Sequence, residues 1–134
     1  MEFGKDAVIE VKDVCIFQGL DAVLQDVNFS IGKDEFVFLI GRTGSGKSSL
    51  LKTLYADLSL KMGQAEIVGF QLSKIKKSEV PFLRRKLGIV FQDFQLFPDR
   101  SIAENLFFVM KATGWKYKEK MKNRMIEVLL KVGL

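Results

Sequence analysis

Residues 41–48 read Gly41-Arg42-Thr43-Gly44-Ser45-Gly46-Lys47-Ser48, which fits the pattern G-x-x-x-x-G-K-[ST]. Glycine adopts positive φ angles without steric cost, so successive backbone N–H groups can turn inward and form a nest for an anion. A helix that begins near Lys47 adds the partial positive charge of its free N-terminal amides. Lys47 can reach the β and γ phosphates, and the Ser48 hydroxyl can bind the Mg²⁺ that bridges them. The pattern therefore predicts a loop that binds nucleotide phosphates.

The residues on both sides of this loop have the character that the motif requires. The loop is preceded by a continuous apolar run, Phe36-Val37-Phe38-Leu39-Ile40, which is typical of a strand buried on both faces. Residues 49–55 follow, and a helix there places its leucines on one side: Leu50, Leu51 and Leu54. A glycine-rich turn that matched by chance would lack this order of strand, loop and helix, so we interpret the loop as functional.

The composition limits the class of protein. With 134 residues, of which 48% are hydrophobic, the chain amounts to one domain or a piece of a larger one. No apolar run approaches the roughly 20 residues of a membrane span, and the N-terminus lacks the pattern of an export signal. A single cysteine, Cys15, excludes an internal disulfide and fits a reducing compartment. The net charge of +5 suits a nucleotide or an acidic membrane face, although a solvated lysine-rich surface explains much of it.

The sequence upstream of the loop predicts an antiparallel β layer. Hydrophobic and polar residues alternate over residues 7–17 and again over residues 23–31, which is typical of half-buried strands. The short turn between these runs, at residues 19–21, favours antiparallel pairing. Phe17 ends the first strand, where its ring could stack on a nucleobase or serve as an ordinary core residue.

Downstream of the loop, the sequence predicts a short strand at residues 64–68 and then a short helix that runs through Arg85, with Ser78 as its N-cap. A second buried strand is predicted at residues 87–91. Gln92 would then lie at the carboxyl end of that strand, where open α/β sheets bind their ligands. Its amide oxygen can coordinate Mg²⁺ or hold an attacking water, although a glutamine taken alone is most often a surface residue.

Two helices are expected in the remaining sequence. A capping box, Ser101-Ile102-Ala103-Glu104, starts a helix that ends near Thr113 and Gly114. A second helix covers residues 117–132, and Gly133 follows it at C′. Its apolar stripe consists of Met121, Met125, Val128, Leu129 and Val132. We expect this stripe to pack on the protein's own core rather than to form a groove for a partner.

The strand, the glycine-rich loop and the glutamine-bearing strand end together resemble the N-terminal half of an ABC-transporter ATPase, over essentially the whole chain. The resemblance implies an α/β fold in which a P-loop NTPase core, a partly parallel sheet with helices, follows the antiparallel β layer. It implies a β layer at residues 1–35, a P-loop core at residues 36–100 and a helical part at residues 101–134.

The same resemblance implies that ATP and Mg²⁺ are the ligands. The aromatic residue that stacks on adenine in the family maps by position to Phe17, and the glutamine of the Q-loop maps to Gln92. Ser48 and Gln92 would contact the metal, and Lys47 and Gln92 would take part in catalysis. The residues implied in cofactor binding are Phe17, Gly41, Arg42, Thr43, Gly44, Ser45, Gly46, Lys47, Ser48, Ser49 and Gln92. Ser49 stands where the family more often has a threonine.

Within the family, residues 79–94 and the following Pro98-Asp99-Arg100 resemble the FtsE branch, cell-division ATPases that partner the membrane protein FtsX. ATPases of lipoprotein and macrolide exporters share the flanking pattern and remain an alternative. The resemblance implies that an FtsX-like integral membrane subunit docks at residues 92–98 and that the intact ATPase subunit forms a homodimer. It further implies a cytoplasmic location, on the inner face of the plasma membrane, and no nucleic-acid partner.

The sequence departs from the family by what it does not contain. The LSGGQ signature, the acidic Walker B strand with its catalytic glutamate, and the switch histidine are absent, and the chain has no histidine at all. We therefore expect a truncated domain that binds ATP without hydrolysing it, whereas the intact protein would be an ATPase. A nucleotide-binding module without turnover is the second functional class. A kinase or GTPase ranks third, because no N-K-x-D string occurs.

Overall fold

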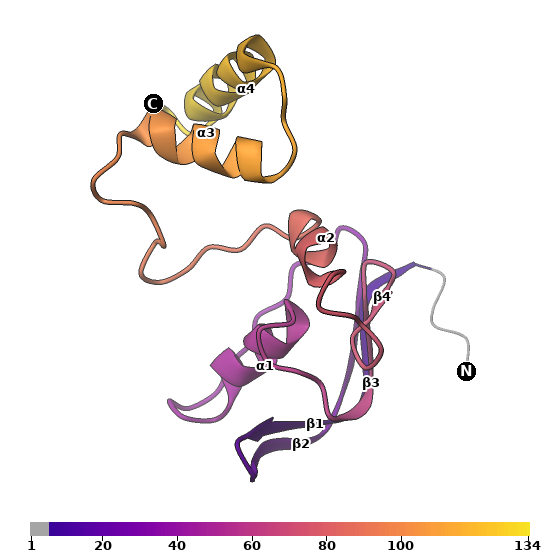
Figure 1. The fold of residues 1–134 in the computed structure, drawn as a ribbon. Helices are drawn as coiled ribbons and strands as arrows, with labels where there is room; N and C mark the ends of the chain where they lie inside the picture. Colours follow the sequence, from indigo (N-terminus) through magenta and orange to yellow (C-terminus); the bar gives the residue numbers. More distant parts are fainter. Residues whose placement is uncertain (1–5) are drawn as a thin grey trace. The chain divides into compact units, whose positions relative to one another are not determined.

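The computed structural model describes residues 6–134, which divide into two compact units, one ending at Gly88 and the other spanning Ile89–Leu134. The division into three parts at residues 35 and 100 stays a prediction. The elements are labelled in Figure 1 and run in the order β1 (Ala7–Gln18), β2 (Asp21–Gly32), α1 (Lys47–Leu54), β3 (Met62–Ile67), β4 (Phe70–Gln71), α2 (Val80–Arg85), α3 (Ile102–Ala112) and α4 (Lys118–Lys131).

The first unit is built on a four-stranded antiparallel sheet with the strand order β2-β1-β3-β4. The predicted hairpin of the first two strands is confirmed, since Val11 of β1 lies opposite Phe29 of β2. On its other edge β1 pairs with β3, where Val11 lies opposite Ala65. Because β1 has a neighbour on each side, it is central in the sheet and its alternate side chains reach the core. The short strand β4 was not predicted.

The core of the first unit lies between this sheet and the helices α1 and α2. Helix α1 lies beside β1 (Figure 1), as the contacts between these two elements also show. Helix α2 contributes Leu83, which is fully buried, and Arg84 fixes the helix by donating to the carbonyls of Tyr55 and Ala56 at 3.0 and 3.2 Å. The buried core residues are Val11, Val14, Ile16, Leu50, Ala65, Ile67, Leu72 and Leu83.

The second unit contains the two predicted helices α3 and α4, which pack side by side. The capping box is confirmed: the Ser101 hydroxyl accepts from the Glu104 amide at 3.2 Å, and the Glu104 carboxylate accepts from the Ser101 amide at 2.8 Å. Helix α4 ends as expected, with Gly133 at φ +80°. Its stripe is buried at Met121 and half-buried at Met125, Val128 and Leu129, whereas Val132 is exposed beyond the helix end.

Two predicted strands and one predicted cap are wrong. Neither the run of residues 36–40 nor residues 87–91 pairs into a sheet, and the first run is exposed. A strand buried on both faces needs hydrogen-bonded neighbours and helices over each face, and within residues 6–134 these runs have no paired neighbour. The N-cap of α2 is Glu79 rather than Ser78, a difference of one residue that helix ends often show.

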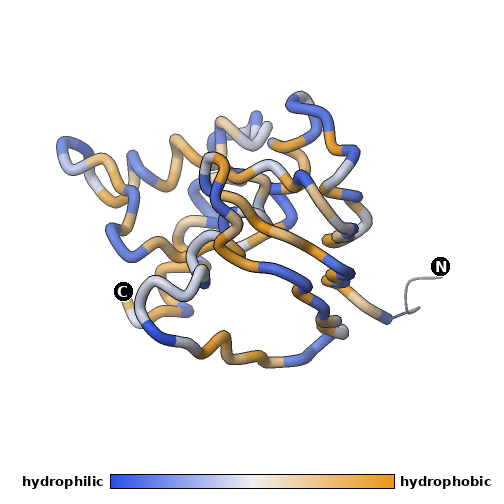
Figure 2. Tube along the Cα trace, turned by 90° about the horizontal axis from the view of Figure 1, so that it is seen from below, coloured by the Kyte–Doolittle hydropathy of each residue, from blue (hydrophilic) through white to orange (hydrophobic). Residues whose placement is uncertain are grey.

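Short hydrophobic stretches alternate with hydrophilic ones along the Cα trace (Figure 2). Between residues 6 and 134, none of the helices combines the length and the apolar character that crossing a bilayer requires.

Candidate functional site

The glycine-rich loop ends at the N-terminus of α1, as the motif requires. A turn within the loop is closed by the Ser45 amide, which donates to the Arg42 carbonyl at 3.1 Å. Gly44 and Gly46 have φ angles of +80° and +90°. Gly46 is the N-cap residue of α1, where it offers no side chain to the first amides, and the first turn of the helix carries no acidic residue. The amides and the positive end of the helix dipole are therefore available to an anion.

The Lys47 side chain folds back across the loop. Its ammonium group donates to the carbonyls of Gly41 and Arg42, each at 2.7 Å, and lies 3.4 Å from the Ser45 hydroxyl. All of these partners are oxygen atoms of the loop itself. Phosphate oxygens would supply the same kind of acceptor, so this donor set fits a phosphate group.

Two of the three glycines of the loop have no room for a side chain. A Cβ atom on Gly41 would lie 2.7 Å from the Ser45 hydroxyl oxygen. A Cβ atom on Gly46 would lie 2.7 Å from Cγ of Leu24, a residue of β2 that sequence reasoning did not single out. The loop is thus a cradle of backbone atoms, held by close contact with the sheet.

The two serines after Lys47 have different surroundings. Ser48 is exposed in the first turn of α1, where its hydroxyl can bind a metal ion next to a phosphate. Ser49 is buried, and its hydroxyl accepts a hydrogen bond from the Gln18 side-chain amide at 2.9 Å. The Ser49 carbonyl accepts from the Thr53 hydroxyl at 2.9 Å. These contacts give Ser49 a structural part, whereas the Ser48 hydroxyl is exposed to solvent.

The predicted aromatic residue lies on the strand that contacts α1. Phe17 is half-buried near the end of β1, and the next residue, Gln18, makes the hydrogen bond to Ser49. The Lys61 ammonium lies 5.8 Å from the centroid of the Phe17 ring and donates to the Gly19 carbonyl at 3.3 Å. Nothing in the sequence pattern indicates Lys61, because its contact with Phe17 is long-range.

Gln92 lies in the other unit, so the structure assigns it no distance from the loop. It is exposed in a turn rather than at the end of a strand, which corrects the predicted position. The turn is closed by the Phe94 amide, which donates to the Phe91 carbonyl at 3.2 Å. Phe94 in this turn and Leu96 beyond it are 74% and 66% exposed.

The segment after this turn is fixed to α3 by a residue that sequence reasoning missed. The Asn105 side chain accepts from the Phe97 amide at 2.9 Å and donates to the Phe97 carbonyl at 3.1 Å. Its amide also donates to the Ser101 carbonyl at 3.0 Å. An asparagine in a helix gives no periodic pattern from which this contact could have been predicted.

Residues 24–134 match the family model described as ABC transporter. Over 129 residues the chain is 37% identical to the cell division ATP-binding protein FtsE of Streptococcus pneumoniae. This match covers 96% of the chain and 56% of that protein. It is 33% identical over 132 residues to the methionine import ATP-binding protein MetN 2 of Salmonella choleraesuis, covering 95% of this chain and 39% of the relative. The chain thus spans about half the length of the curated relatives, or less.

Among solved structures, the chain is similar to that of the ATP-binding cassette MJ0796. That structure is described as a dimeric post-hydrolysis state bound to ADP and Pi. The TM-score is 0.76 at 30% sequence identity, and the match covers 90% of this chain and 55% of the other. This similarity confirms the predicted α/β fold class.

Proposed function

Because the chain belongs to the ABC transporter family of ATPases, we propose that residues 41–49 bind Mg-ATP and that the protein is the ATPase subunit of a membrane complex resembling FtsE. The backbone of the loop and Lys47 would hold the β and γ phosphates, and Ser48 would hold the Mg²⁺. When bound, this ion neutralises phosphate charge. Phe17 would stack on adenine, and Gln92 would be the Q-loop glutamine that contacts the metal and the attacking water.

The observation that carries this proposal is the Lys47 ammonium, which lies across the loop on three oxygen atoms at the uncapped start of α1. We expect Lys47→Ala to weaken ATP binding by about 100-fold or more, because charge-assisted hydrogen bonds to phosphate are lost. Isothermal titration with Mg-ATP measures this. Lys52→Ala is the matched control, since Lys52 lies on the same helix but in its last turn. Equal affinity of the two variants would refute the role of Lys47.

We also propose that residues 92–98 dock an FtsX-like integral membrane subunit, which places the protein in the cytoplasm on the inner face of the plasma membrane. The exposed Phe94 and Leu96 support this, because adjacent large apolar side chains on a loop are typical of docking surfaces. In the full-length protein, Phe94→Asp should abolish co-purification with the membrane subunit while ATP binding is unchanged. Leu20→Asp, at an apolar position that is 96% exposed in the turn between β1 and β2, is the control.

Two alternatives differ from this proposal in what they predict. The first alternative is a nucleotide-binding module without turnover. Phosphate release that Lys47→Ala removes would exclude this module. The other alternative is the ATPase of a lipoprotein, macrolide or methionine transporter. The membrane subunit that co-purifies with the full-length protein distinguishes it from an FtsE-like ATPase.

A further inference from the structure

A strongly basic part of the chain lies where α3 connects to α4. Residues 111–124 carry six cationic side chains and only one carboxylate, Glu119. All of the cationic side chains are exposed: Lys111, Lys116, Lys118, Lys120, Lys122 and Arg124. This density of positive charge attracts an anionic partner.

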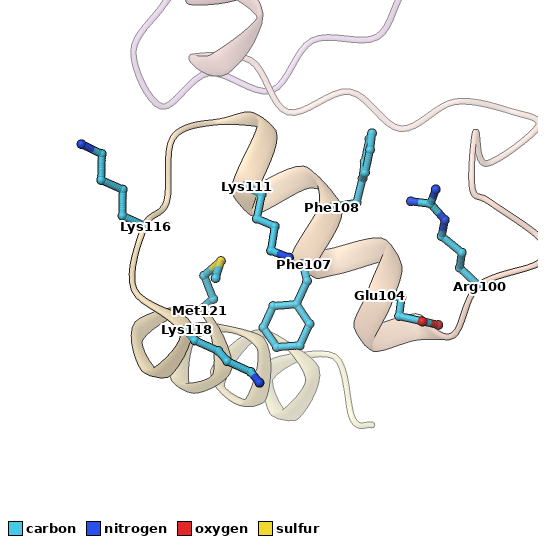
Figure 3. A pocket seen from close by; sticks show the side chains of 8 residues that line it. All are labelled: Arg100, Glu104, Phe107, Phe108, Lys111, Lys116, Lys118 and Met121. Carbon is cyan, nitrogen blue, oxygen red and sulfur yellow. The ribbon is translucent and has the colours of Figure 1, made fainter.

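Three of these lysines line a hollow of about 530 Å³ within the second unit. Figure 3 shows that they come from different elements: Lys111 from α3, Lys116 from the connection and Lys118 from the start of α4. Between the helices, Phe107 and Met121 form an apolar part of the lining. The one carboxylate of the lining, Glu104, is engaged in the capping box of α3. Cationic side chains beside an apolar part of the lining fit an amphipathic anion.

Two aromatic side chains alternate with the lysines of the connection. Trp115 and Tyr117 are 39% and 66% exposed, and the Lys120 ammonium lies 5.1 Å from the centroid of the Tyr117 ring. The Trp115 amide donates to the Met110 carbonyl at 3.0 Å, which fixes the connection to the end of α3. Exposed tryptophan and tyrosine beside lysine are the side chains that favour the boundary between lipid headgroups and acyl chains.

The cations of this region that form no ion pair within residues 6–134 are lysines, which favour a surface with many anionic groups over a single carboxylate as the partner. Arg124, whose planar group could bind one carboxylate with two hydrogen bonds, is already paired with Glu127 at 2.8 Å. No ion pair engages Lys111, Lys116 or Lys118 in the part of the chain that the structure describes. Lysines act as mobile point charges, which suits the many phosphates of a bilayer surface.

We propose that Lys111, Trp115, Lys116, Tyr117, Lys118 and Lys120 form a basic–aromatic face that binds the headgroups of anionic phospholipids. Phosphates lie against the lysines, and the two aromatic rings enter the headgroup layer. This contact with lipid is independent of the loop at residues 41–48 and adds to any docking on a membrane subunit.

The chain offers a built-in reporter, because Trp115 is its only tryptophan. Its emission should shift to shorter wavelength with vesicles of mixed phosphatidylglycerol and phosphatidylcholine, and should not shift with phosphatidylcholine alone. Cosedimentation with the same vesicles gives the partition coefficient. The triple variant Lys116→Gln, Lys118→Gln, Lys120→Gln should partition roughly 100-fold more weakly, at about fivefold for each lysine near the surface. Added salt should weaken binding of the parent chain.

The matched control is Lys74→Gln, Lys76→Gln, Lys77→Gln, which removes the same charge from three exposed lysines of the first unit. Equal partition of the two triple variants, or a Trp115 emission that the mixed vesicles leave unchanged, would overturn the proposal. Tight binding of a polyglutamate peptide without vesicle binding would assign the face to an acidic protein instead. Lys47→Ala should leave vesicle binding unchanged, so this test succeeds or fails separately from the proposed ATP binding.

Discussion

At the scale of single residues, two constraints act on Gly46, a positive φ angle and a close neighbour, whereas only the first acts on Gly44. Both have positive φ angles, but only at Gly46 would a Cβ atom meet Leu24. We expect Gly44→Ala to lower the free energy of unfolding by about 1–2 kcal/mol through backbone strain. Gly46→Ala should lower it by roughly a further 1–3 kcal/mol, because the added methyl overpacks the contact with Leu24. Chemical denaturation of the two variants measures the difference.

The ligand-binding consequence of these substitutions is separable from stability. Gly46→Ala should also weaken Mg-ATP binding, because the loop must shift away from β2 to admit the methyl group. In a Leu24→Ala background, Gly46→Ala should cost less stability than in the parent chain, since the atoms that the new methyl meets are gone. If the Gly44→Ala and Gly46→Ala variants are equally stable, the close packing of the loop on β2 does not restrict which residue is tolerated at position 46.

At the scale of elements, the N-terminus of α3 depends on one hydroxyl group. The Ser101 hydroxyl accepts from the Glu104 amide, and the hydrogen bonds that Glu104 receives from Ser101 hold the pKa of its carboxyl below the usual range. Ser101→Ala should therefore destabilise the second unit by about 1 kcal/mol and raise the pKa of Glu104. Amide hydrogen exchange in α3 and a carboxyl NMR titration measure the two effects. Ser78→Ala should change neither, because Ser78 does not cap α2.

The end of α4 should respond to acid through Glu127. Its hydrogen bonds with Lys131 and then Arg124 lower the pKa of this carboxyl from 4.5 to about 2. A lowered pKa means that the stabilisation is complete above about pH 4.5 and is lost as the pH falls through about 2. Lys131→Ala should move the Glu127 pKa back toward its ordinary value in an NMR titration. Lys122→Ala, on the same helix, should not; a shift of equal size in both variants would exclude the specific contact with Lys131.

Local patterns predicted most of these elements, and non-local contacts account for the failures. The capping box at Ser101, the glycine at the end of α4 and the alternation in β1 each depend on neighbours in sequence, and the structure confirms all three. The glycine-rich loop was found because the spacing of its residues alone matches the motif. Burial of residues 36–40 depends on strands elsewhere in the chain, which an apolar run alone does not reveal. The same holds for Gln18, whose partner Ser49 is distant in sequence.

At the scale of the whole molecule, the run of residues 36–40 leaves a contiguous apolar surface exposed. Exposure alternates along it, from 83% at Phe36, 76% at Phe38 and 87% at Ile40 to 56% at Val37 and 46% at Leu39. The Phe36 and Phe38 rings contact each other, with their centroids 5.0 Å apart. A period of two is that of an extended segment with one face more exposed than the other, and within residues 6–134 no strand pairs with it. Such an edge is a template for association.

We therefore predict that the chain associates with a second copy of itself through this run. Sedimentation velocity should show a mass that rises with concentration, and the melting temperature should rise with it, because association stabilises the folded state by mass action. Phe38→Lys should shift the chain toward monomer, since a charge on the uncovered face opposes burial. Leu20→Lys should not, although Leu20 is 96% exposed, because it lies in the turn between β1 and β2 rather than in the apolar run. A parent chain that stays monomeric, with a cooperative melt independent of concentration, would show that these residues tolerate water without a partner strand.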